Sequence, residues 1–587
     1  MRLVVHHQIP EGPTLRRQWN QVVFQMEHPQ VFYTWEWARA MQSAYCASLT
    51  PFLFLGYEGD DLVGIASLAT DHAERNASFL AAATSDYCDF CSRPDHRRQL
   101  VDAVLAELRK TGVESLALAS IPADSPTVAA IRAAARQHGY HVLMHPAQVC
   151  AQVILGSGEP RQKLKANVRG KKMFRRNLRM LESEGHITLT HLRSWAEIEA
   201  DLPRFANVHV ARFLVTQQIS TLTRPERRHF LEQLARLLSE SGWLWLSRLN
   251  IGDRAIAWNY GFQFCGSWFW YQPTFESGAW IERYSPGFCL LSKVVEEACE
   301  TTGLDVVDLG VGAESYKDRF ANVSRETLDF SLNQSHFRHQ REVARHWAAR
   351  TIKASPKIES VIRSGLRRLD SVRRKFRQVG TNGLIGWGTK RLAGNVSRRD
   401  EVLFYEWTGA ARRDSHGTEI RPLDLETLAL GAMIDVDDRD TMSYLLRATQ
   451  RLRREDGSGF ALIAPDLRPV HYCWARDFEG FYMDELRVRL TAPSKNAVMI
   501  FDCWTPHSAR GHGYYGLAVS QVAEHLRRAG KAPWIFSASR NIPSVRGIAK
   551  AGFQWRYSMI RRKVLLWQSV RRLPAEISPA TEAVASL

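Results

Sequence analysis

The segment Asn496–Gly516 (NAVMIFDCWTPHSARGHGYYG) constrains the fold of this chain more than any other stretch. Its apolar run Ala497–Trp504 predicts a strand, which leads into the glycine-bearing turn Arg510–Gly513 and then the helical pattern of Tyr514–Arg528. Glycines let the backbone approach a ligand closely, and open N–H groups at a helix start attract phosphate oxygens. The segment therefore predicts a strand–turn–helix unit that holds a pyrophosphate, with Arg510 supplying a fixed positive charge.

The same turn also matches the dinucleotide fingerprint GxGxxG through Gly511, Gly513 and Gly516. That fingerprint requires an acidic residue about twenty positions further on, at the end of the next strand. The next predicted strand is Trp534–Ser537, and the residues that follow it, Ala538–Arg540, include no acid. Too little chain remains for a doubly wound sheet, so the dinucleotide interpretation is excluded.

Two later stretches extend the pattern. Asn541-Ile542-Pro543-Ser544 opens a short helix, and Lys550-Ala551-Gly552-Phe553 follows it. With these, the chain resembles the GNAT acyltransferase superfamily, because the turn is similar to its (Q/R)xxGx(G/A) coenzyme A loop and the later stretches to its NxxS…KxGF segment. The resemblance implies a splayed strand before the loop, a catalytic role for Asn541, and an acyl-CoA donor held by Arg510, Gly511, His512, Gly513, Tyr514 and Tyr515.

Two positions depart from the superfamily pattern. Tyr515 stands where the loop pattern asks for glycine or alanine, and Ile548 stands where many members carry a tyrosine that acts as general acid. The implied fold is unaffected, but the resemblance leaves the proton-transfer residue of this domain unassigned. Asp484 and Glu485, expected on the strand before the loop strand, are weak candidates for the base.

A second series of motifs lies in the N-terminal part of the chain. Its elements are Ser285-Pro286-Gly287, Asp308-x-Gly310-x-Gly312 and Tyr316-Lys317, preceded by Phe32-x-x-Trp35-x-Trp37, Ser85-Asp86-Tyr87 and Ala257. Together they resemble the CelD/BcsL-type acyltransferases associated with bacterial cellulose and exopolysaccharide synthesis. Those proteins are relatives of the FemAB enzymes, which carry two GNAT-like units in tandem. The resemblance covers about residues 25–330.

This second resemblance implies the roles of several residues. Ser285, Pro286 and Gly287 would receive the phosphates of the acyl donor, and Tyr316 and Lys317 would lie beside the reacting centre. Acyl transfer to an amine needs oxyanion-type N–H groups and a base, and transfer in a ternary complex needs no protein nucleophile. The candidate bases are Asp308 and Glu314, although for either acid taken alone a structural hydrogen-bonding role is the more common one.

The expected fold class is α/β with mixed GNAT-like sheets: a tandem FemAB-like pair of acyl-CoA N-acyltransferase units and a C-terminal GNAT domain. The alternation of strands and helices in both N-terminal blocks indicates a pair of units rather than one large sheet. The expected parts are a degenerate unit at 1–150, the CelD-like unit at 151–340, a basic linker with an amphipathic helix at 341–400, the GNAT domain at 401–570 and a flexible tail at 571–587.

The positive charge is concentrated in one stretch. The net charge is +17, and fifteen Lys and Arg residues stand against two acids between Arg345 and Arg399. Apolar residues recur at near-helical spacing from Ile358 to Phe376, so this stretch predicts either a helix on an anionic membrane surface or a solvated helix packed on the protein. A second basic helix, Lys163–Arg179, is open to nucleic-acid binding but carries apolar residues typical of a packed helix.

Composition limits the compartment. Nine cysteines in 587 residues form no disulfide framework, and the single pair Cys88-x-x-Cys91 lacks the further ligands that a zinc site needs, so no metal is expected. The start of the chain has no apolar signal region, and no run of 18 uncharged apolar residues occurs. We expect a cytoplasmic protein, with peripheral contact to the inner face of the membrane as an open possibility.

The predicted function is that of an enzyme, a GNAT-type acyltransferase. The expected reaction moves an acetyl group from acetyl-CoA to an amine or hydroxyl of a sugar or lipid-linked saccharide in envelope or exopolysaccharide synthesis, by direct transfer in a ternary complex. That acceptor class follows from the resemblance. Two alternatives stay open: an aminoacyl-tRNA-dependent transferase of the FemAB kind, and a non-catalytic protein that docks a polysaccharide synthase at the membrane.

Overall fold

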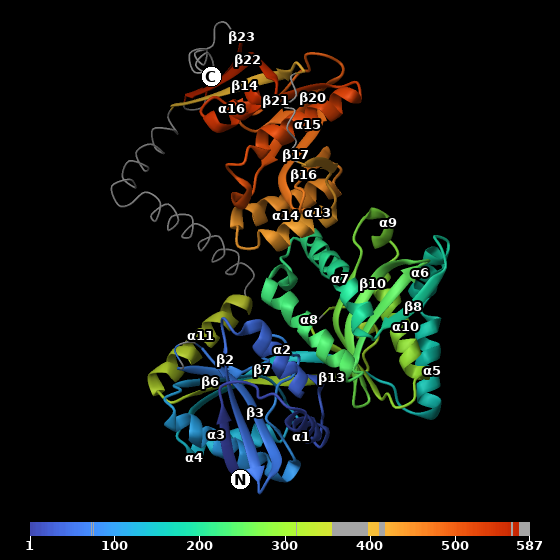
Figure 1. The fold of residues 1–587 in the computed structure, drawn as a ribbon, viewed down its shortest axis with the longest axis vertical. Helices are drawn as coiled ribbons and strands as arrows, with labels where there is room; N and C mark the ends of the chain where they lie inside the picture. The colour runs from blue at the N-terminus through green and yellow to red at the C-terminus, as the bar shows by residue number, and fades with distance from the viewer. Residues whose placement is uncertain are drawn as a thin grey trace. The chain divides into compact units, whose positions relative to one another are not determined.

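The computed structural model of the chain describes residues 1–354, 397–409, 417–564 and 567–574, except His72, Glu74 and Ala313. The chain divides into two compact units. The N-terminal unit comprises Met1–Arg212 and Arg224–Thr351, and the C-terminal unit comprises Phe213–Thr223 and Ile352–Leu587. Each unit is built on one large mixed sheet (Figure 1).

The N-terminal unit contains a 13-stranded sheet in the order β1-β2-β3-β4-β6-β13-β7-β12-β11-β10-β9-β8, with β5 paired to β3. Its strands are β1 (Arg2–His6), β2 (Thr50–Glu58), β3 (Asp61–Thr70), β4 (Asn76–Phe79), β5 (Cys91–Ser92), β6 (Ser115–Pro122), β7 (His141–Ile154), β8 (Ile187–Leu192), β9 (Leu244–Ile251), β10 (Arg254–Phe264), β11 (Ser267–Phe275), β12 (Val306–Val311) and β13 (Val323–Asn333).

Helices cover this sheet, and their sequences show why they form. The side chain of Thr34 caps one helix by accepting a hydrogen bond from the backbone N–H of Trp37, and Pro286 occupies the first turn of another, where its missing N–H costs nothing. The helices are α1 (Pro13–Phe24), α2 (Trp35–Tyr45), α3 (Arg97–Lys110), α4 (Thr127–Gln137), α5 (Gly158–Gly170), α6 (Lys172–Glu182), α7 (Trp195–Val215), α8 (Pro225–Glu240), α9 (Ala279–Glu282), α10 (Pro286–Glu300) and α11 (His336–Ala354).

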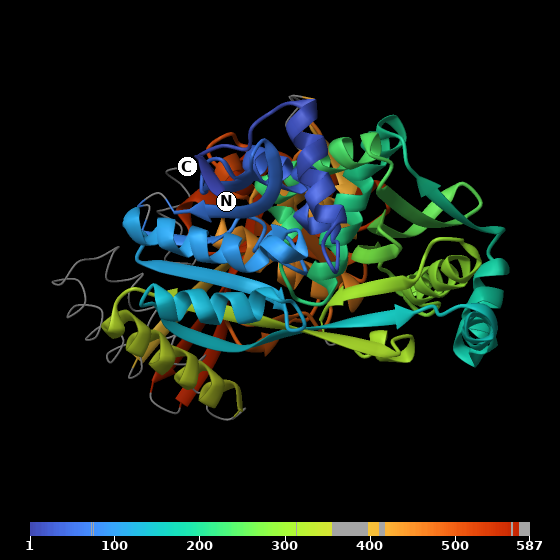
Figure 2. The same cartoon turned by 90° about the horizontal axis from the view of Figure 1, so that it is seen from below.

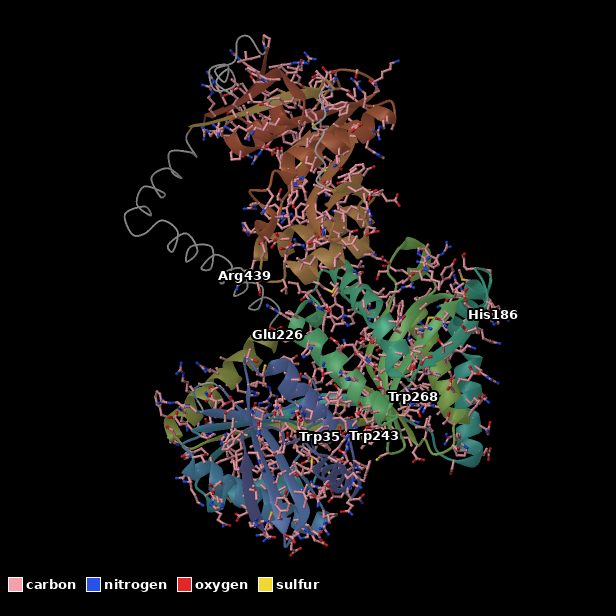
Figure 3. All side chains as sticks on the ribbon, in the orientation of Figure 1. Trp35, His186, Glu226, Trp243, Trp268 and Arg439 are labelled. Carbon is pink, nitrogen blue, oxygen red and sulfur yellow. The ribbon has the colours of Figure 1, made fainter. Side chains whose placement is uncertain are left out.

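Two clusters of apolar side chains are prominent among the described residues of this unit. One is formed by α3 and α4 with the strands from β2 to β6 and the end of β13, and the other by α5, α6 and α10 with β7 and the strands from β9 to β12. Trp268 on β11 is fully buried in the second core (Figure 3). Helix α11, the olive helix in Figure 2, lies against β7 and β13 through side-chain contacts. Among the described residues, no helix combines the length and hydropathy needed to cross a membrane.

The prediction of a pair of units rather than one large sheet is wrong in one respect, because the hydrogen-bonded ladder runs through both halves. Strand β13 pairs with β6 on one side and with β7 on the other, and β7 continues the sheet to β12. At its centre, Leu328 stands opposite both Ile121 and Pro146. The pairing of strands far apart in sequence has no local signature, so the pattern of alternating elements could not reveal it.

The C-terminal unit contains an eight-stranded sheet in the order β15-β16-β17-β20-β21-β14-β22-β23 and a small hairpin of β18 and β19. The strands are β14 (Ser397–Trp407), β15 (Glu419–Pro422), β16 (Ser458–Ile463), β17 (Pro469–Asp477), β18 (Tyr482–Met483), β19 (Val488–Arg489), β20 (Ala497–Trp504), β21 (Ala532–Ala538), β22 (Phe553–Val564) and β23 (Trp567–Pro574). The helices are α13 (Leu425–Ile434), α14 (Arg439–Arg453), α15 (Tyr514–Arg528) and α16 (Ile542–Lys550).

One arrangement occurs three times in the described residues: two parallel neighbouring strands joined by a crossover that contains a helix. The three examples are β4–α3–β6, β11–α10–β12 and β20–α15–β21. In each, antiparallel strands precede the parallel pair along the chain. This repetition agrees with the predicted tandem of GNAT-like α/β units.

Several predicted elements need correction. The basic helix Lys163–Arg179 is two helices, because Lys171, with φ −59° and ψ 119°, interrupts the helical backbone between α5 and α6. Asp484 and Glu485 lie in the turn between β18 and β19, not on a strand. The predicted tail begins too early, since Arg571–Pro574 belong to β23 and pair with β22.

The other domain boundaries stay predictions. The predicted linker 341–400 overlaps α11 as far as Ala354 and β14 from Ser397 onward. Its central part, including the amphipathic pattern from Ile358 to Phe376, lies outside the described residues, as do residues 575–587.

Candidate functional site

Strands β20 and β21 diverge in the middle of the C-terminal sheet. They pair as parallel strands only where Ala497–Ile500 stand beside Ala532–Ile535. Beyond that point β20 continues against β17 and β21 against β14. A cavity of about 1090 Å³ opens here, lined by Phe501–Trp504 on one strand and by Phe536–Ala538 on the other. This divergence is the splay that the superfamily resemblance implies.

A bulge in β20 shapes the wall of the cavity. Trp504 stands opposite Tyr472 and Phe501 opposite Trp474, so Asp502 and Cys503 share the space of one partner residue. Asp502 adopts φ +46°, which is rare for a residue with a side chain. Its carboxylate accepts a hydrogen bond from Arg451, and its carbonyl accepts one from Tyr444 Oη at 3.2 Å. Bulges re-aim backbone groups, and here the re-aimed groups border the cavity.

The glycine turn ends at the same cavity. Gly511 and Gly513 have φ +85° and +78°, a backbone region that favours glycine. No side chain caps α15, so the N–H groups of its first turn are open to an anion. The predicted donor-binding residues Arg510, Gly511, Gly513, Tyr514 and Tyr515 all line the cavity. His512 is not part of the lining, and its ring stacks on Tyr514 with 5.6 Å between centroids.

Tyr515, the residue that departs from the loop pattern, fits because α16 carries a glycine beside it. A Cβ atom at Gly547 would lie 2.4 Å from Tyr515 Cδ1. The hydroxyl of Tyr515 lies 2.8 Å from Ser544 Oγ, in hydrogen-bonding contact. The ring therefore joins α15 to α16 beside the turn. Ile548, the second departure, is fully buried in the apolar core, which explains why no polar group stands there.

The cavity has one strongly basic side. Arg510, Arg546 and Lys550 line it, all three are exposed, and Arg546 and Lys550 make no ion pair with any described residue. Asn541 also lines the cavity, and its side-chain oxygen accepts a hydrogen bond from the backbone N–H of Ser544 at 3.4 Å, which caps α16. Glu485 borders the cavity and Asp484 does not. The arrangement suits a ligand that carries several phosphates.

A second divergence occurs in the N-terminal unit, between β11 and β12. Residues Ser267–Phe269 pair with Val306–Asp308, after which β11 stays with β10 and β12 with β7. Helix α10 begins beside it, with Ser285 at φ +51° and no side-chain cap. A Cβ atom at Gly287 would lie 2.8 Å from Phe275 Cδ1, so this glycine is needed for close packing of the helix start on β11.

Asp308 lies at this second divergence as a fully hydrogen-bonded carboxylate. It is 2% exposed and accepts hydrogen bonds from Tyr87 Oη at 2.9 Å, Gln152 Nε2 at 2.8 Å and the backbone N–H of Gly310 at 2.8 Å. Burial raises the pKa of Asp308, and the bonds from Gln152, Gly310 and Tyr87 oppose that rise. Asp308, one of the two predicted bases, is therefore fixed in position by three hydrogen bonds.

The other three predicted residues of this unit form a second group. Lys317 is 4% exposed; its Nζ donates to Val311 O at 2.6 Å and forms an ion pair with Glu314 at 2.8 Å. Burial raises the pKa of Tyr316 to about 12, with a further contribution from Glu314. The ammonium of Lys317 is therefore engaged by the glycine-containing end of β12 and by Glu314.

Asp86 was not among the predicted site residues, although the motif Ser85-Asp86-Tyr87 contains it. Burial and the charge of Asp308 raise the pKa of Asp86 to about 7, against the opposing charge of Lys317. Its carboxylate fills the space beside Gly310, where a Cβ atom would lie 2.5 Å from Asp86 Oδ2. The loop after β4 thus brings a carboxyl group from the first half of the sheet to the divergence in the second half.

The structure therefore gathers the predicted residues into two separate places. Residues 285–287, 308, 314, 316 and 317 lie around α10 and β12 of the N-terminal unit. The turn 510–515 and Asn541 lie around α15 and α16 of the C-terminal unit. Among the described residues, no group of three or more His, Cys, Asp or Glu side chains is arranged to hold a metal ion.

Comparison with known proteins identifies a family match in the N-terminal unit, around α10 and β12. Residues 168–318 match the family model described as "Acetyltransferase (GNAT) domain". No curated protein matches the chain. The match covers α6 to β12, including Ser285–Gly287, Asp308 and the Glu314–Lys317 group.

Solved structures resemble the chain at low identity. A crystal structure of FemX has 9% identity and a TM-score of 0.41, over 56% of this chain and 97% of that one. The C-terminal domain of a putative lysylphosphatidylglycerol synthetase from Agrobacterium fabrum has 10% identity and a TM-score of 0.34, over 56% and 94%. A tandem GNAT protein from the clavulanic acid biosynthesis pathway has 12% identity and a TM-score of 0.31, over 57% of this chain and 99% of that one.

All three TM-scores lie below 0.5, and the assignment rests on the family model. The parallel pair β11 and β12 with α10 between them lies inside the matched segment and has the organisation expected of that family. Residues 168–318 are therefore an acetyltransferase (GNAT) domain, which makes this chain an acyltransferase enzyme.

Proposed function

We propose that the enzyme moves an acetyl group from acetyl-CoA to an amine or hydroxyl of a sugar or lipid-linked saccharide in envelope or exopolysaccharide synthesis. The observation that carries the proposal is the cavity at the divergence of β20 and β21, which the glycine turn Arg510–Gly513 borders. Transfer is direct, in a ternary complex of enzyme, donor and acceptor. Residues Ser285–Gly287 are the corresponding donor-binding residues of the N-terminal unit.

The basic side of the cavity suits the phosphates of coenzyme A. Arg510, Arg546 and Lys550 supply three positive charges, and the uncapped start of α15 supplies backbone N–H groups. Beyond Ile500 the inward edge of β20 has no strand partner in β21, so its backbone is open to orient the acyl carbonyl. N–H groups placed in this way stabilise the oxyanion that forms when the carbonyl is attacked.

The aromatic part of the lining suits an acceptor that carries a sugar. Phe501 and Phe536 line the cavity, and aromatic faces stack on sugar rings. The acceptor's nitrogen or oxygen attacks the thioester carbonyl carbon, the C–S bond breaks, and coenzyme A leaves as the thiolate. The acceptor's proton passes to a base, for which Glu485 is the carboxylate of the lining that makes no ion pair with a described residue.

The same reaction in the N-terminal unit would draw on Asp86. With a pKa near 7, its carboxyl group exchanges protons close to neutral pH, whereas Asp308 is held by three donors. Tyr316 and Lys317 flank the same divergence. We therefore infer that Asp86 rather than Asp308 or Glu314 is the proton acceptor of this unit.

Calorimetric titration of acetyl-CoA into the whole protein tests the donor site. The double variant Arg546→Glu/Lys550→Glu reverses two charges at the rim of the cavity and should abolish one binding event. The matched control Lys531→Glu/Arg562→Glu makes the same change in charge at exposed positions outside the lining and should leave binding intact.

Three outcomes separate the alternatives. Loss in the rim variant only places the donor in the C-terminal unit, and unchanged binding in both variants moves the donor to the N-terminal unit. A parent protein that binds no coenzyme A thioester contradicts the proposal. Release of the coenzyme A thiol is then compared with glucosamine and with aminoacyl-tRNA added, and release only with the tRNA would replace the saccharide as the partner.

A further inference from the structure

A groove lies between α11 and the sheet of the N-terminal unit, away from β11 and β12. Its volume is about 700 Å³. The floor is formed by side chains of β4, β6, β7 and β13, and the wall by side chains of α11. The lining residues on α11 are Phe337, Arg338, Arg341, Glu342, Arg345 and His346. No residue of either candidate acyl-transfer site belongs to this lining.

The arginines of the groove are unequally neutralised. Arg338 forms an ion pair with Glu114, which is thereby engaged. Arg341 and Arg345 are exposed and form no ion pair with any described residue. They stand one helical turn apart, so both guanidinium groups project on the same side of α11. Two free guanidinium groups with this spacing suit the oxygens of a phosphate, which arginine binds in a bidentate manner.

One carboxylate opposes them. Glu342 lines the groove, but its oxygen is turned to the sheet, where it accepts hydrogen bonds from Ser331 Oγ and from Asn333 Nδ2 at 2.7 Å. These neutral donors hold the carboxylate in place and leave its charge uncompensated. The charges of Arg341 and Arg345 therefore exceed the single charge of Glu342.

Imidazole rings add further donors. His145 on β7 and His346 on α11 both line the groove, and their rings stack with 4.1 Å between centroids. Imidazole N–H groups bind phosphate oxygens as arginine does. At the rim, Phe337 is 76% exposed and offers an apolar face beside the charged groups.

We propose that this groove is a second ligand site, which binds the phosphate group of a ligand between Arg341, Arg345 and the His145–His346 pair. Two kinds of molecule carry such a group: a soluble phosphate compound and an anionic lipid headgroup. The phosphate chemistry is common to both. The proposal stands independently of the proposed acetyl transfer, because none of its residues belongs to a donor or acceptor site.

The test uses the whole protein without coenzyme A, whose own pyrophosphate would compete for the groove, and with Arg546→Glu/Lys550→Glu in every variant to weaken phosphate binding at the C-terminal donor site. Inorganic pyrophosphate is titrated by calorimetry, and sedimentation is measured with vesicles of phosphatidylglycerol and, separately, of phosphatidylcholine. Arg341→Gln and Arg345→Gln should each weaken binding about tenfold, as loss of a charge-assisted hydrogen bond does. The control Arg350→Gln removes an exposed charge of the same helix outside the groove and should change binding less than twofold.

A variant that is expected to bind more tightly distinguishes a change at the site from misfolding, because misfolding would weaken binding. Glu342→Gln keeps an oxygen that accepts from Asn333 but removes the opposing charge, so pyrophosphate should bind more tightly. Binding of pyrophosphate without binding of vesicles supports the site with a soluble phosphate compound as its ligand. Binding of phosphatidylglycerol but not phosphatidylcholine vesicles supports it with an anionic lipid headgroup. The proposal is overturned if neither probe binds, if Arg350→Gln weakens binding as much as Arg341→Gln, or if Glu342→Gln weakens it.

Discussion

The hydroxyl of Tyr87 donates a hydrogen bond of 2.9 Å to Asp308 Oδ2 across 221 residues of sequence. Tyr87 lies in the loop after β4 and Asp308 on β12, so the bond joins the first half of the N-terminal sheet to the acetyltransferase domain. Both side chains are buried. The domain recognised at 168–318 thus depends on a residue that lies outside the matched segment.

Removing this bond should destabilise the unit. We expect Tyr87→Phe to lower the free energy of unfolding by about 1–3 kcal/mol, because a buried carboxylate loses one of its three donors. Urea unfolding followed by fluorescence measures the change. Tyr57→Phe, at a half-buried tyrosine on β2, is the control and should cost less than about 0.5 kcal/mol. Equal losses of unfolding free energy in the two variants would show that the hydrogen bond from Tyr87 to Asp308 does not contribute to stability.

Asp86 should make the stability of the N-terminal unit depend on pH. Its folded-state pKa of about 7 lies above the ordinary value of 3.8. The stabilisation is therefore fully present below pH 3.8 and is lost as the pH rises through about 7. The shift corresponds to at most about 4 kcal/mol.

The variant Asp86→Asn has nearly the shape of the protonated carboxyl group, but its amide does not ionise in this pH range. Between pH 4 and 8 the melting temperature of the parent protein should fall relative to that of the variant. Parallel curves for the two proteins across this range would show that Asp86 does not carry a raised pKa.

The contact between Tyr515 and Gly547 predicts a reversal of sign. Gly547→Ala should destabilise the C-terminal unit by about 1–3 kcal/mol, because the new methyl group meets the ring of Tyr515. In a Tyr515→Ala background the same change should stabilise by about 0.5–1 kcal/mol, since alanine favours a helix over glycine. A double-mutant cycle from chemical unfolding measures both values. A loss of similar size in both backgrounds would contradict the proposed fit.

Asp438 links α14 to the segment before the glycine turn. Its carboxylate caps α14 through the N–H groups of Asp440 and Thr441 and also accepts from the N–H of His507 at 3.2 Å. Burial opposes ionisation, yet bonds from Thr441 and His507 lower the pKa of Asp438 to about 2. The stabilisation is therefore present above the ordinary value of 3.8 and is lost as the pH falls through about 2.

Asp438→Ala should cost about 1–2 kcal/mol at neutral pH. The cost should shrink as the pH approaches 2, because the parent protein then loses the same charge. Asp424→Ala, which removes a cap of α13 with a single bond from Thr427, is the matched comparison and should cost less. The reverse order in thermal melts would show that the bond to His507 contributes nothing.

Local sequence patterns predicted much of the fold. The run from Ala497 through the glycine turn to Arg528 forms β20 and α15, as predicted. These features depend on residues close together in sequence, where apolar periodicity and glycine placement act directly. The divergence of β20 and β21 followed from the family resemblance.

The rest of the candidate site depends on contacts that no local pattern encodes. Asp86 reaches Gly310, and Tyr87 reaches Asp308, only because the loop after β4 crosses to β12. The groove beside α11 is lined by residues from β4, β6, β7 and β13, which lie far apart in the sequence. The sequence alone therefore indicates only that the arginines of α11 belong to a charged surface. By contrast, the break between α5 and α6 had a signal in Gly170, which the apolar pattern of Lys163–Arg179 obscured.

The central position of β13 has a consequence for synthesis. Strand β6 ends at Pro122 and its partner β13 begins at Val323, so about 200 residues must leave the ribosome before the pair can form. At about 5–20 residues per second this takes roughly ten to forty seconds. During that time one side of β6 offers unpaired backbone groups of the kind that promote aggregation. The nascent chain therefore passes through a vulnerable interval, and its yield in the cell should depend on chaperones that shield this edge until residue 333 emerges.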